Sequence, residues 1–222
     1  MVNQSPHILM LLGGTWHDFD GFERSVGGVL RDRGAKVEPT YDLASLKHLN
    51  DFDVVLNYTC LSQTREDGTP LERRFTDDDV VLLENWVSRG RGLLMAHCGT
   101  VACQASPKLA KLVGGVFIRH PPALTFEVFP TTSGHQVTAG VRAFEVRDEF
   151  YFHRVDTEIA VHMVALHDGV AHPMVWTRQA GHGRVAVVAP GHDGGVWVVP
   201  QYQQLITQSV DWLAQKAGKG NL

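Results

Sequence analysis

The sequence predicts an α/β domain with a mainly parallel central sheet and helices on both of its faces. Short apolar runs that end in glycine or in polar turns recur along the chain, as buried strands do. Segments with apolar residues at helical spacing lie between several of these runs, which is typical of βαβ units. Hydrophobic residues make up 44% and charged residues 20% of the 222 residues, the balance of a globular protein.

The first half of the chain alternates strands and helices. A helix is predicted over residues 21–33, where apolar residues recur at helical spacing before Gly34. A second helix is predicted over 76–90, because Thr76 and Asp79 form a capping signature at the start of an acidic first turn. Strands are predicted at residues 7–14, 35–41, 53–59 and 91–100.

The second half is richer in strands and aromatic residues. Its strands are predicted at residues 123–129, 144–155, 160–169, 171–178 and 183–193. An amphipathic helix is predicted from about residue 200 to 216, with its apolar face on the sheet. No linker-like segment interrupts the pattern, so we expect one domain over residues 1–217 and a frayed tail over 218–222.

Charge and motif content exclude several classes of function. Twenty basic and 24 acidic residues give a net charge of −4, so we expect no nucleic-acid partner. No apolar run approaches the ~18 residues of a membrane span, the start is not a secretory signal, and the three cysteines show no CxxC spacing. We therefore expect a cytoplasmic protein with reduced thiols. Gly13 and Gly14 lack the GxGxxG pattern, so no nucleotide cofactor is expected.

Histidines gather where the predicted strands end. In open parallel sheets, ligands bind outside the carboxyl ends of the strands. Three of four such ends in this sequence are followed by a histidine, the side chain best suited to proton transfer and metal ligation near neutral pH. The polar residues at these ends are His17, Asn57, Tyr58, His97, Cys98, His192 and Asp193.

The segment MAHCGT predicts a strand followed by a tight turn and a helix, which would present one side chain on a strained elbow. If Cys98 occupies the elbow, it could act as a thiolate nucleophile. If His97 occupies it, the site would use acid–base or metal chemistry. A third interpretation is that Cys98 is a small buried apolar side chain, as free cysteines often are.

Several segments, in order along nearly the whole chain, match a known family. They include GGTWHDF, LVGGVFIRHPP, FEVRDEFYF and PMVWTRQAGHGRVAVVAPGHD. On these segments the chain resembles the ThuA-like (trehalose-utilisation) family of the class I glutamine amidotransferase-like superfamily. The resemblance implies a flavodoxin-like three-layer sandwich with a mainly parallel central sheet. It also implies a role in sugar catabolism, alongside oxidoreductases that handle trehalose and related glycosides.

The resemblance also indicates which residue occupies the elbow. Amidotransferases of this fold carry a cysteine there, whereas the matching position in this sequence is His97, one residue before Cys98. The resemblance therefore argues against glutamine hydrolysis.

Site residues follow from the resemblance and from the strand ends. His97, Glu149 and Tyr151 are the predicted catalytic residues, and His120 and His192 the predicted ligands of a divalent metal, zinc or manganese. Predicted substrate-binding residues are His17, Asn57, Trp176 and Arg178. Structural roles compete with several of these assignments: Trp176 could be core, Arg178 could form an ion pair, and Tyr151 could be structural.

The favoured hypothesis is proton transfer, isomerisation or elimination/hydrolysis on an oxidised (keto) sugar or glycoside, with His97 or Glu149 as base. One alternative is a non-catalytic sugar-binding or regulatory module, and another is a hydrolase that depends on Cys98. We expect a small sugar as ligand. A homodimer through aromatic residues is a further expectation, with Phe150, Tyr151, Phe152 and Trp197 as candidates for the contact or for the core.

Overall fold

The computed structural model describes residues 5–61, 74–131 and 134–215. Within them, one large sheet runs through the molecule and a smaller two-stranded sheet lies beside it. The strands of the large sheet are β1 (His7–Gly14), β2 (Lys36–Thr40), β3 (Val54–Cys60), β4 (Gly92–Ala96), β6 (Leu124–Pro130), β7 (Phe144–Asp148), β9 (Ala160–His167), β10 (Val170–Ala180) and β11 (Gly183–Val188). The small sheet pairs β5 (Gly115–Arg119) with β8 (Phe152–Val155).

The large sheet is mixed, with the order β2-β1-β3-β4-β11-β10-β9-β6-β7. The pairs from β2 to β11 are parallel, and every pair from β11 to β7 is antiparallel. The predicted parallel arrangement thus describes only one half. The reason lies in the connections: β9, β10 and β11 are joined by turns too short for the crossover that parallel strands require.

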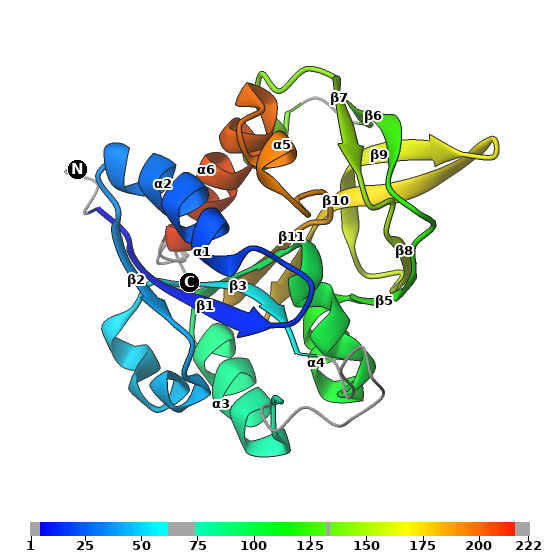
Figure 1. Ribbon diagram of the computed structural model, residues 1–222. Helices are drawn as coiled ribbons and strands as arrows, with labels where there is room; N and C mark the ends of the chain where they lie inside the picture. Colours follow the sequence, from blue (N-terminus) through cyan, green and yellow to red (C-terminus); the bar gives the residue numbers. More distant parts are fainter. Residues whose placement is uncertain (1–4, 62–73, 132–133, 216–222) are drawn as a thin grey trace.

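Helices cover both faces of the parallel half (Figure 1). One face carries α1 (Phe19–Phe22), the π-helical turn η1 (Glu23–Gly27), α2 (Gly28–Asp32), α5 (Gly194–Trp197) and α6 (Pro200–Ala214). The other carries α3 (Asp77–Ser88) and α4 (Pro107–Val113). Short 3₁₀ segments complete the described elements: η2 (Leu43–Asp51), η3 (His97–Gln104) and η4 (Gln136–Thr138).

Local signals set the helix boundaries. The capping box predicted for Thr76 and Asp79 is confirmed, with both reciprocal bonds present. The first helix begins at Phe19, two residues before the predicted start, because the carboxylate of Asp18 accepts the backbone N–H of Gly21. The final helix ends at Ala214, and the predicted tail over 218–222 lies outside the described residues.

The strand predicted over 144–155 is broken. Residues 144–148 form β7 at the edge of the large sheet, and residues 152–155 form β8 in the small one. Between them, Glu149 to Tyr151 leave the strand conformation. The carboxylate of Asp148 accepts the backbone N–H of Glu149, which turns the chain at this point.

The core contains most of the aromatic residues that were considered for a dimer contact. Phe150 is fully buried, and Tyr151 and Trp197 are each 2% exposed, so these three pack within the chain. The homodimer stays a prediction. Among the described residues, no helix is long and apolar enough to cross a membrane.

Candidate functional site

The carboxyl ends of the parallel strands meet at one edge of the sheet. Gly14 of β1 pairs with Cys60 of β3, and Ala96 of β4 pairs with Val188 of β11. The loops that follow β1, β4 and β11 therefore lie side by side, as parallel topology requires. Each of these loops carries one of the predicted histidines.

His17 follows β1 in a loop that a glycine makes possible. Gly14 has a φ of +117°, and a Cβ at this position would lie 2.2 Å from the carbonyl oxygen of Cys60. The chain then turns into the sheet edge, where His17 Nδ1 lies 3.0 Å from the carbonyl oxygen of Thr15. A carbonyl can only accept, so Nδ1 carries the proton and Nε2 carries the lone pair.

His97 occupies the strained elbow after β4. Its φ of +41° is in the left-handed region, which is uncommon for a residue with a side chain. The ring is fully buried, and its Nδ1 lies 2.8 Å from the carbonyl oxygen of Ala189. The same tautomer argument places the lone pair of His97 on Nε2.

Cys98 follows the elbow by one residue and does not line the cavity beside it. Its side chain is fully buried, and burial raises the pKa of the thiol well above its usual range. A thiol that stays protonated is a poor nucleophile, because the thiolate is the reactive form. These properties fit the interpretation of Cys98 as a buried apolar residue.

Asp148 joins the end of β7 to the loop after β11. Its carboxylate, 2% exposed, accepts the backbone N–H groups of Gly191 at 2.7 Å and of His192 at 3.1 Å, besides that of Glu149 at 2.8 Å. β7 is the outermost strand, four positions from β11 in the sheet order. One carboxylate therefore places both Glu149 and His192 at the same edge.

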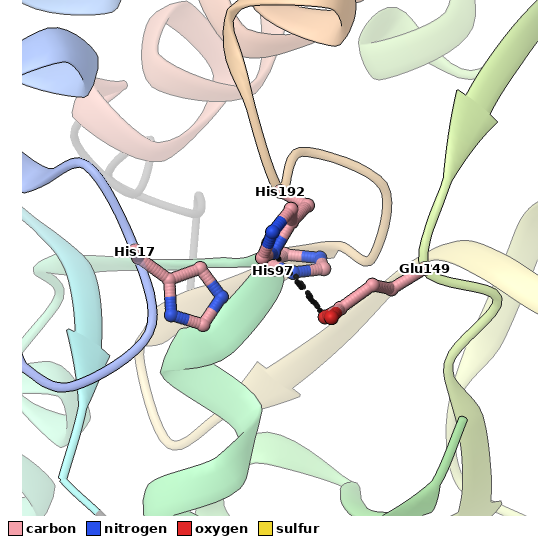
Figure 2. Close-up of side chains that lie close together, drawn as sticks. All are labelled: His17, His97, Glu149 and His192. Carbon is pink, nitrogen blue, oxygen red and sulfur yellow. Dashed lines mark ion pairs between the residues drawn. The ribbon is translucent and has the colours of Figure 1, made fainter. Parts of the chain in front are cut away.

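Four side chains converge between these loops (Figure 2). One ligand atom from each of His17, His97, Glu149 and His192 lies within 4.8 Å of all the others. A carboxylate oxygen of Glu149 lies 3.5 Å from His97 Nε2 and 3.3 Å from His192 Nδ1. We call these four residues the histidine–glutamate cluster.

Within the described part of the chain, buried nitrogens of the cluster have no hydrogen-bond partner. This holds for Nε2 of His17, Nε2 of His97 and Nδ1 of His192. In the neutral tautomer, the lone pair of His97 Nε2 faces a carboxylate oxygen, and two lone pairs repel each other. A proton or a cation between the two atoms removes the repulsion. Three imidazoles and one carboxylate are also a suitable donor set for a divalent transition metal.

The pKa shifts within the cluster also favour a cation between these side chains. Burial, and after it the nearby His97, lowers the pKa of His17 to about 3, so His17 is neutral at pH 7. Burial raises the pKa of Glu149, but contacts with His192 and His97 more than offset this and hold it below its usual value. Contact with Glu149 raises the pKa of His192. The cluster thus combines a neutral imidazole with an ionised carboxylate.

A cavity of about 470 Å³ opens beside the cluster. Among the described residues its lining consists of Trp16, His17, Cys60, Val101, Gln104, Phe117, His120, Glu149 and Tyr151. His120 follows β5, and its Nε2 lies 3.6 Å from the second carboxylate oxygen of Glu149. Its Nδ1 lies 2.8 Å from the carbonyl oxygen of Pro121, so the lone pair is again on Nε2.

The structure brings together most, but not all, of the predicted site residues. Tyr151 lies at the site, with its ring centroid 4.1 Å from that of His97 and 5.5 Å from that of His120. His192 belongs to the cluster, as does His17, which was predicted to bind substrate. His120 was predicted as a metal ligand with His192, but it is not a member of the cluster, in which its recorded partner is Glu149.

Three predicted substrate-binding residues lie elsewhere. Asn57 is 1% exposed beneath the elbow, where its amide accepts a hydrogen bond from the Thr59 hydroxyl. Trp176 is fully buried and its indole N–H donates to the carbonyl of Val113. Arg178 forms ion pairs with Asp156 and Glu158. None of the three lines the cavity, so their assignment to substrate binding is not carried further.

Comparison with known proteins identifies the family. The family model described as ThuA, trehalose utilisation, matches residues 16–213. The chain belongs to the ThuA family. No curated protein matches the sequence.

Solved structures agree with this family in their fold. A ThuA-like protein from Parabacteroides merdae has a TM-score of 0.79 at 15% identity, covering 98% of this chain and 93% of its own. A cytoplasmic protein from Salmonella typhimurium LT2 has a TM-score of 0.69 at 15% identity, covering 94% of this chain and all of its own. A β-galactosidase from Bacillus circulans has a TM-score of 0.60 at 11% identity, covering 96% of this chain but only 32% of its own. At these identities the likeness concerns the fold alone.

Some site residues of this ThuA-family chain were missed from the sequence. The place of Asp148 directly before Glu149 was the signal in the sequence for its linking role. Trp16 could have been noticed as the bulky residue between Gly14 and His17. Gln104 and Phe117 gave no such signal, because their place depends on how η3 and β5 pack.

Proposed function

We propose that this chain is a sugar-catabolic enzyme that moves a proton at a carbon next to the carbonyl of an oxidised sugar, with a divalent metal held by the histidine–glutamate cluster. The observation that carries this proposal is the set of inward-facing imidazole lone pairs around the Glu149 carboxylate, beside a cavity. The family description, trehalose utilisation, supports a sugar as substrate. We also propose that the fold is the flavodoxin-like three-layer sandwich that the resemblance implies.

The proposed metal ligands are His17 Nε2, His97 Nε2, His192 Nδ1 and a carboxylate oxygen of Glu149. The carbonyls of Thr15 and Ala189 hold two of the rings in the required tautomer, as partners of metal-binding histidines commonly do. Zinc and manganese both accept such donors. When bound, such an ion polarises a carbonyl oxygen as a Lewis acid.

His120 is the proposed base. The two residues predicted for this role, His97 and Glu149, are both committed to the cluster. His120 stands outside it, with a side chain 35% exposed and its Nε2 lone pair available on the cavity side. A histidine suits proton transfer near neutral pH. Return of the proton to the neighbouring carbon gives isomerisation, and loss of a substituent from the next carbon gives elimination.

Tyr151 is proposed to hold the two rings apart. Its ring packs against both His97 and His120, so it separates the proposed ligand from the proposed base. The ring is 2% exposed, and burial raises the pKa of its hydroxyl well above the usual range. Tyr151 is therefore protonated at pH 7 and positions its neighbours without carrying charge.

Exchange of a sugar proton in D₂O tests the proposed reaction. A glucoside oxidised to a ketone is followed by ¹H NMR with wild type, His120→Gln and the matched control His135→Gln, which lies outside the cavity. We expect exchange or product with wild type and the control, and a loss of about 100-fold in His120→Gln. Equal rates in His120→Gln and wild type would contradict the role of His120.

Absence of exchange by wild type, whether apo or loaded with zinc or manganese, would contradict the proposed function itself. If wild type then still bound the sugar, the non-catalytic sugar-binding module would replace it.

Elemental analysis tests the metal separately. We expect close to one divalent ion per chain in wild type and in His135→Ala. The variants His17→Ala and His192→Ala should each lose most of it, since each removes one of four donors. Metal content that is unchanged in both variants would exclude the cluster as the site.

The place of action is proposed to be the cytoplasm. Two of the structural relatives are described as cytoplasmic proteins from Salmonella typhimurium. The expectation from the three cysteines is the same, because Cys60, Cys98 and Cys103 are free and buried.

A further inference from the structure

Trp16 stands at the edge of the cavity in an unusual state. Its side chain is 53% exposed, although tryptophan is among the most buried residues on average. Its φ of +76° lies in the left-handed region, which is unfavourable for a residue with a side chain. A strained backbone that exposes a large apolar ring needs a compensating reason, and such outliers cluster at ligand-binding sites.

Because of this backbone conformation, the side chains of the consecutive residues Trp16 and His17 lie in different places. His17 enters the cluster, whereas Trp16 remains at the rim and lines the cavity. Directly after them, Asp18 caps α1 and fixes the end of the loop. The loop is therefore anchored on both sides of the pair, by Gly14 against Cys60 and by the cap of Asp18. Trp16 is held in place rather than left on a free loop.

The rest of the lining is amphipathic. Phe117 and Tyr151 pack against each other, with ring centroids 4.3 Å apart, and add further aromatic surface. Gln104, His120 and Glu149 add polar groups, and the Gln104 amide is oriented by its bond to the carbonyl of Phe117. Among the described residues, neither lysine nor arginine lines the cavity. The described side chains of the lining thus offer aromatic faces and hydrogen bonds, and no lysine or arginine among them would hold a phosphate.

We propose that Trp16 is a stacking platform for a pyranose ring, and that the cavity selects an uncharged sugar or glycoside over a phosphorylated one. A pyranose has a face of C–H groups, which packs on the electron-rich face of an indole, and a rim of hydroxyls for the polar groups. The proposal rests on the proposed function, since it names the substrate class of the same site. It adds a binding residue that does not touch the histidine–glutamate cluster's ligand atoms.

Binding measured by calorimetry and by tryptophan fluorescence tests the proposal. The probes are methyl glucopyranoside, trehalose and glucose 6-phosphate, titrated into wild type, Trp16→Ala and Trp16→Phe. We expect Trp16→Ala to weaken binding of the neutral sugars about tenfold or more, and Trp16→Phe, which keeps an aromatic face, to weaken it less than about threefold. Leu166→Ala is the matched control, because Leu166 is also 53% exposed but does not line the cavity.

Fluorescence gives a readout specific to the platform. Trp86, Trp176 and Trp197 are each at most 5% exposed, and Trp212, which is partly buried, does not line the cavity, so a sugar that covers Trp16 should shift emission in wild type and not in Trp16→Phe. Metal content should be the same in all variants. Unchanged affinity in Trp16→Ala, absence of sugar binding by wild type, or tighter binding of glucose 6-phosphate than of methyl glucopyranoside would each overturn the proposal.

The two proposals fail in distinguishable ways. Binding requires no turnover, so sugar affinity that depends on Trp16 without proton exchange would uphold the platform and contradict the reaction. Proton exchange at a normal rate and KM in Trp16→Ala would uphold the reaction and contradict the platform.

Discussion

The two halves of the large sheet contribute different things to the site. The parallel half supplies three histidines, His17, His97 and His192, each in the segment that follows a strand. The antiparallel half and the small sheet supply Glu149 and the part of the cavity wall that Phe117, His120 and Tyr151 form. The parallel half alone would hold three imidazoles, and the second half adds the carboxylate and closes the pocket. The site therefore exists only where the halves meet.

Removing the Asp148 carboxylate, which links the two halves, should have the largest effect on stability. Asp148→Ala leaves three backbone N–H groups, two of them from the loop after β11, without their charged acceptor. We expect the free energy of unfolding to fall by about 3 kcal/mol in urea titrations, together with loss of bound metal. Asp193→Ala, which removes the exposed cap of α5 in the same loop, should cost only about 1 kcal/mol and keep the metal. Equal losses in the two variants would refute the linking role of Asp148.

The contact between β8 and η3 should make stability depend on pH. His153 Nε2 lies 3.0 Å from the Thr100 hydroxyl, and burial lowers the pKa of His153 from 6.5 to about 3. The unfolded chain binds this proton below about pH 6.5 and the folded chain does not, so stability falls as the pH falls from 6.5 toward 3. The slope for one such group is at most about 1.4 kcal/mol per pH unit.

Urea midpoints at pH 7.5 and pH 5 measure this slope. We expect a smaller drop in His153→Gln, which keeps a hydrogen-bonding group beside Thr100 but has no proton to gain. His182→Gln is the control, because His182 is exposed. An undiminished drop in His153→Gln would show that other groups cause the acid sensitivity.

Strain within the parallel half should be measurable at the elbow. Both His97→Gly and His97→Ala remove a donor from the cluster, and both should lose metal. The glycine variant accepts the positive φ of +41° without penalty, so we expect it to be about 1 kcal/mol more stable than the alanine variant. Thermal melts of the two metal-free variants compare them directly. If the alanine variant were the more stable, the elbow would not be strained.

The smallest change in stability and sugar affinity is expected for a substitution on β10, away from the site. Arg178→Gln removes ion pairs with Asp156 and with Glu158, whose side chain is 72% exposed and screened by solvent. We expect a loss of about 1 kcal/mol or less in unfolding free energy, and sugar affinity within about twofold of wild type. A sugar affinity about tenfold weaker would restore Arg178 as a substrate-binding residue.

The sequence predicts the parallel half better than the antiparallel half, for a physical reason. A buried strand followed by a histidine is a local pattern, and parallel topology brings such strand ends together. The position of Glu149 depends on how four antiparallel strands return to β11, which no local pattern encodes. Trp176 and Arg178, assigned from the resemblance, do not line the cavity because contacts distant in sequence fix their side chains: the carbonyl of Val113 for Trp176, and Asp156 and Glu158 for Arg178.

The residues of the cluster come from distant parts of the chain, and this affects when the cluster forms during folding. Its members come from position 17, near the beginning, and from positions as late as 192. Such long-range contacts give a high contact order, and they form late in folding. The chain emerging from the ribosome therefore has no complete site until the last strand of the sheet is in place. The histidine–glutamate cluster is thus complete only in the folded chain.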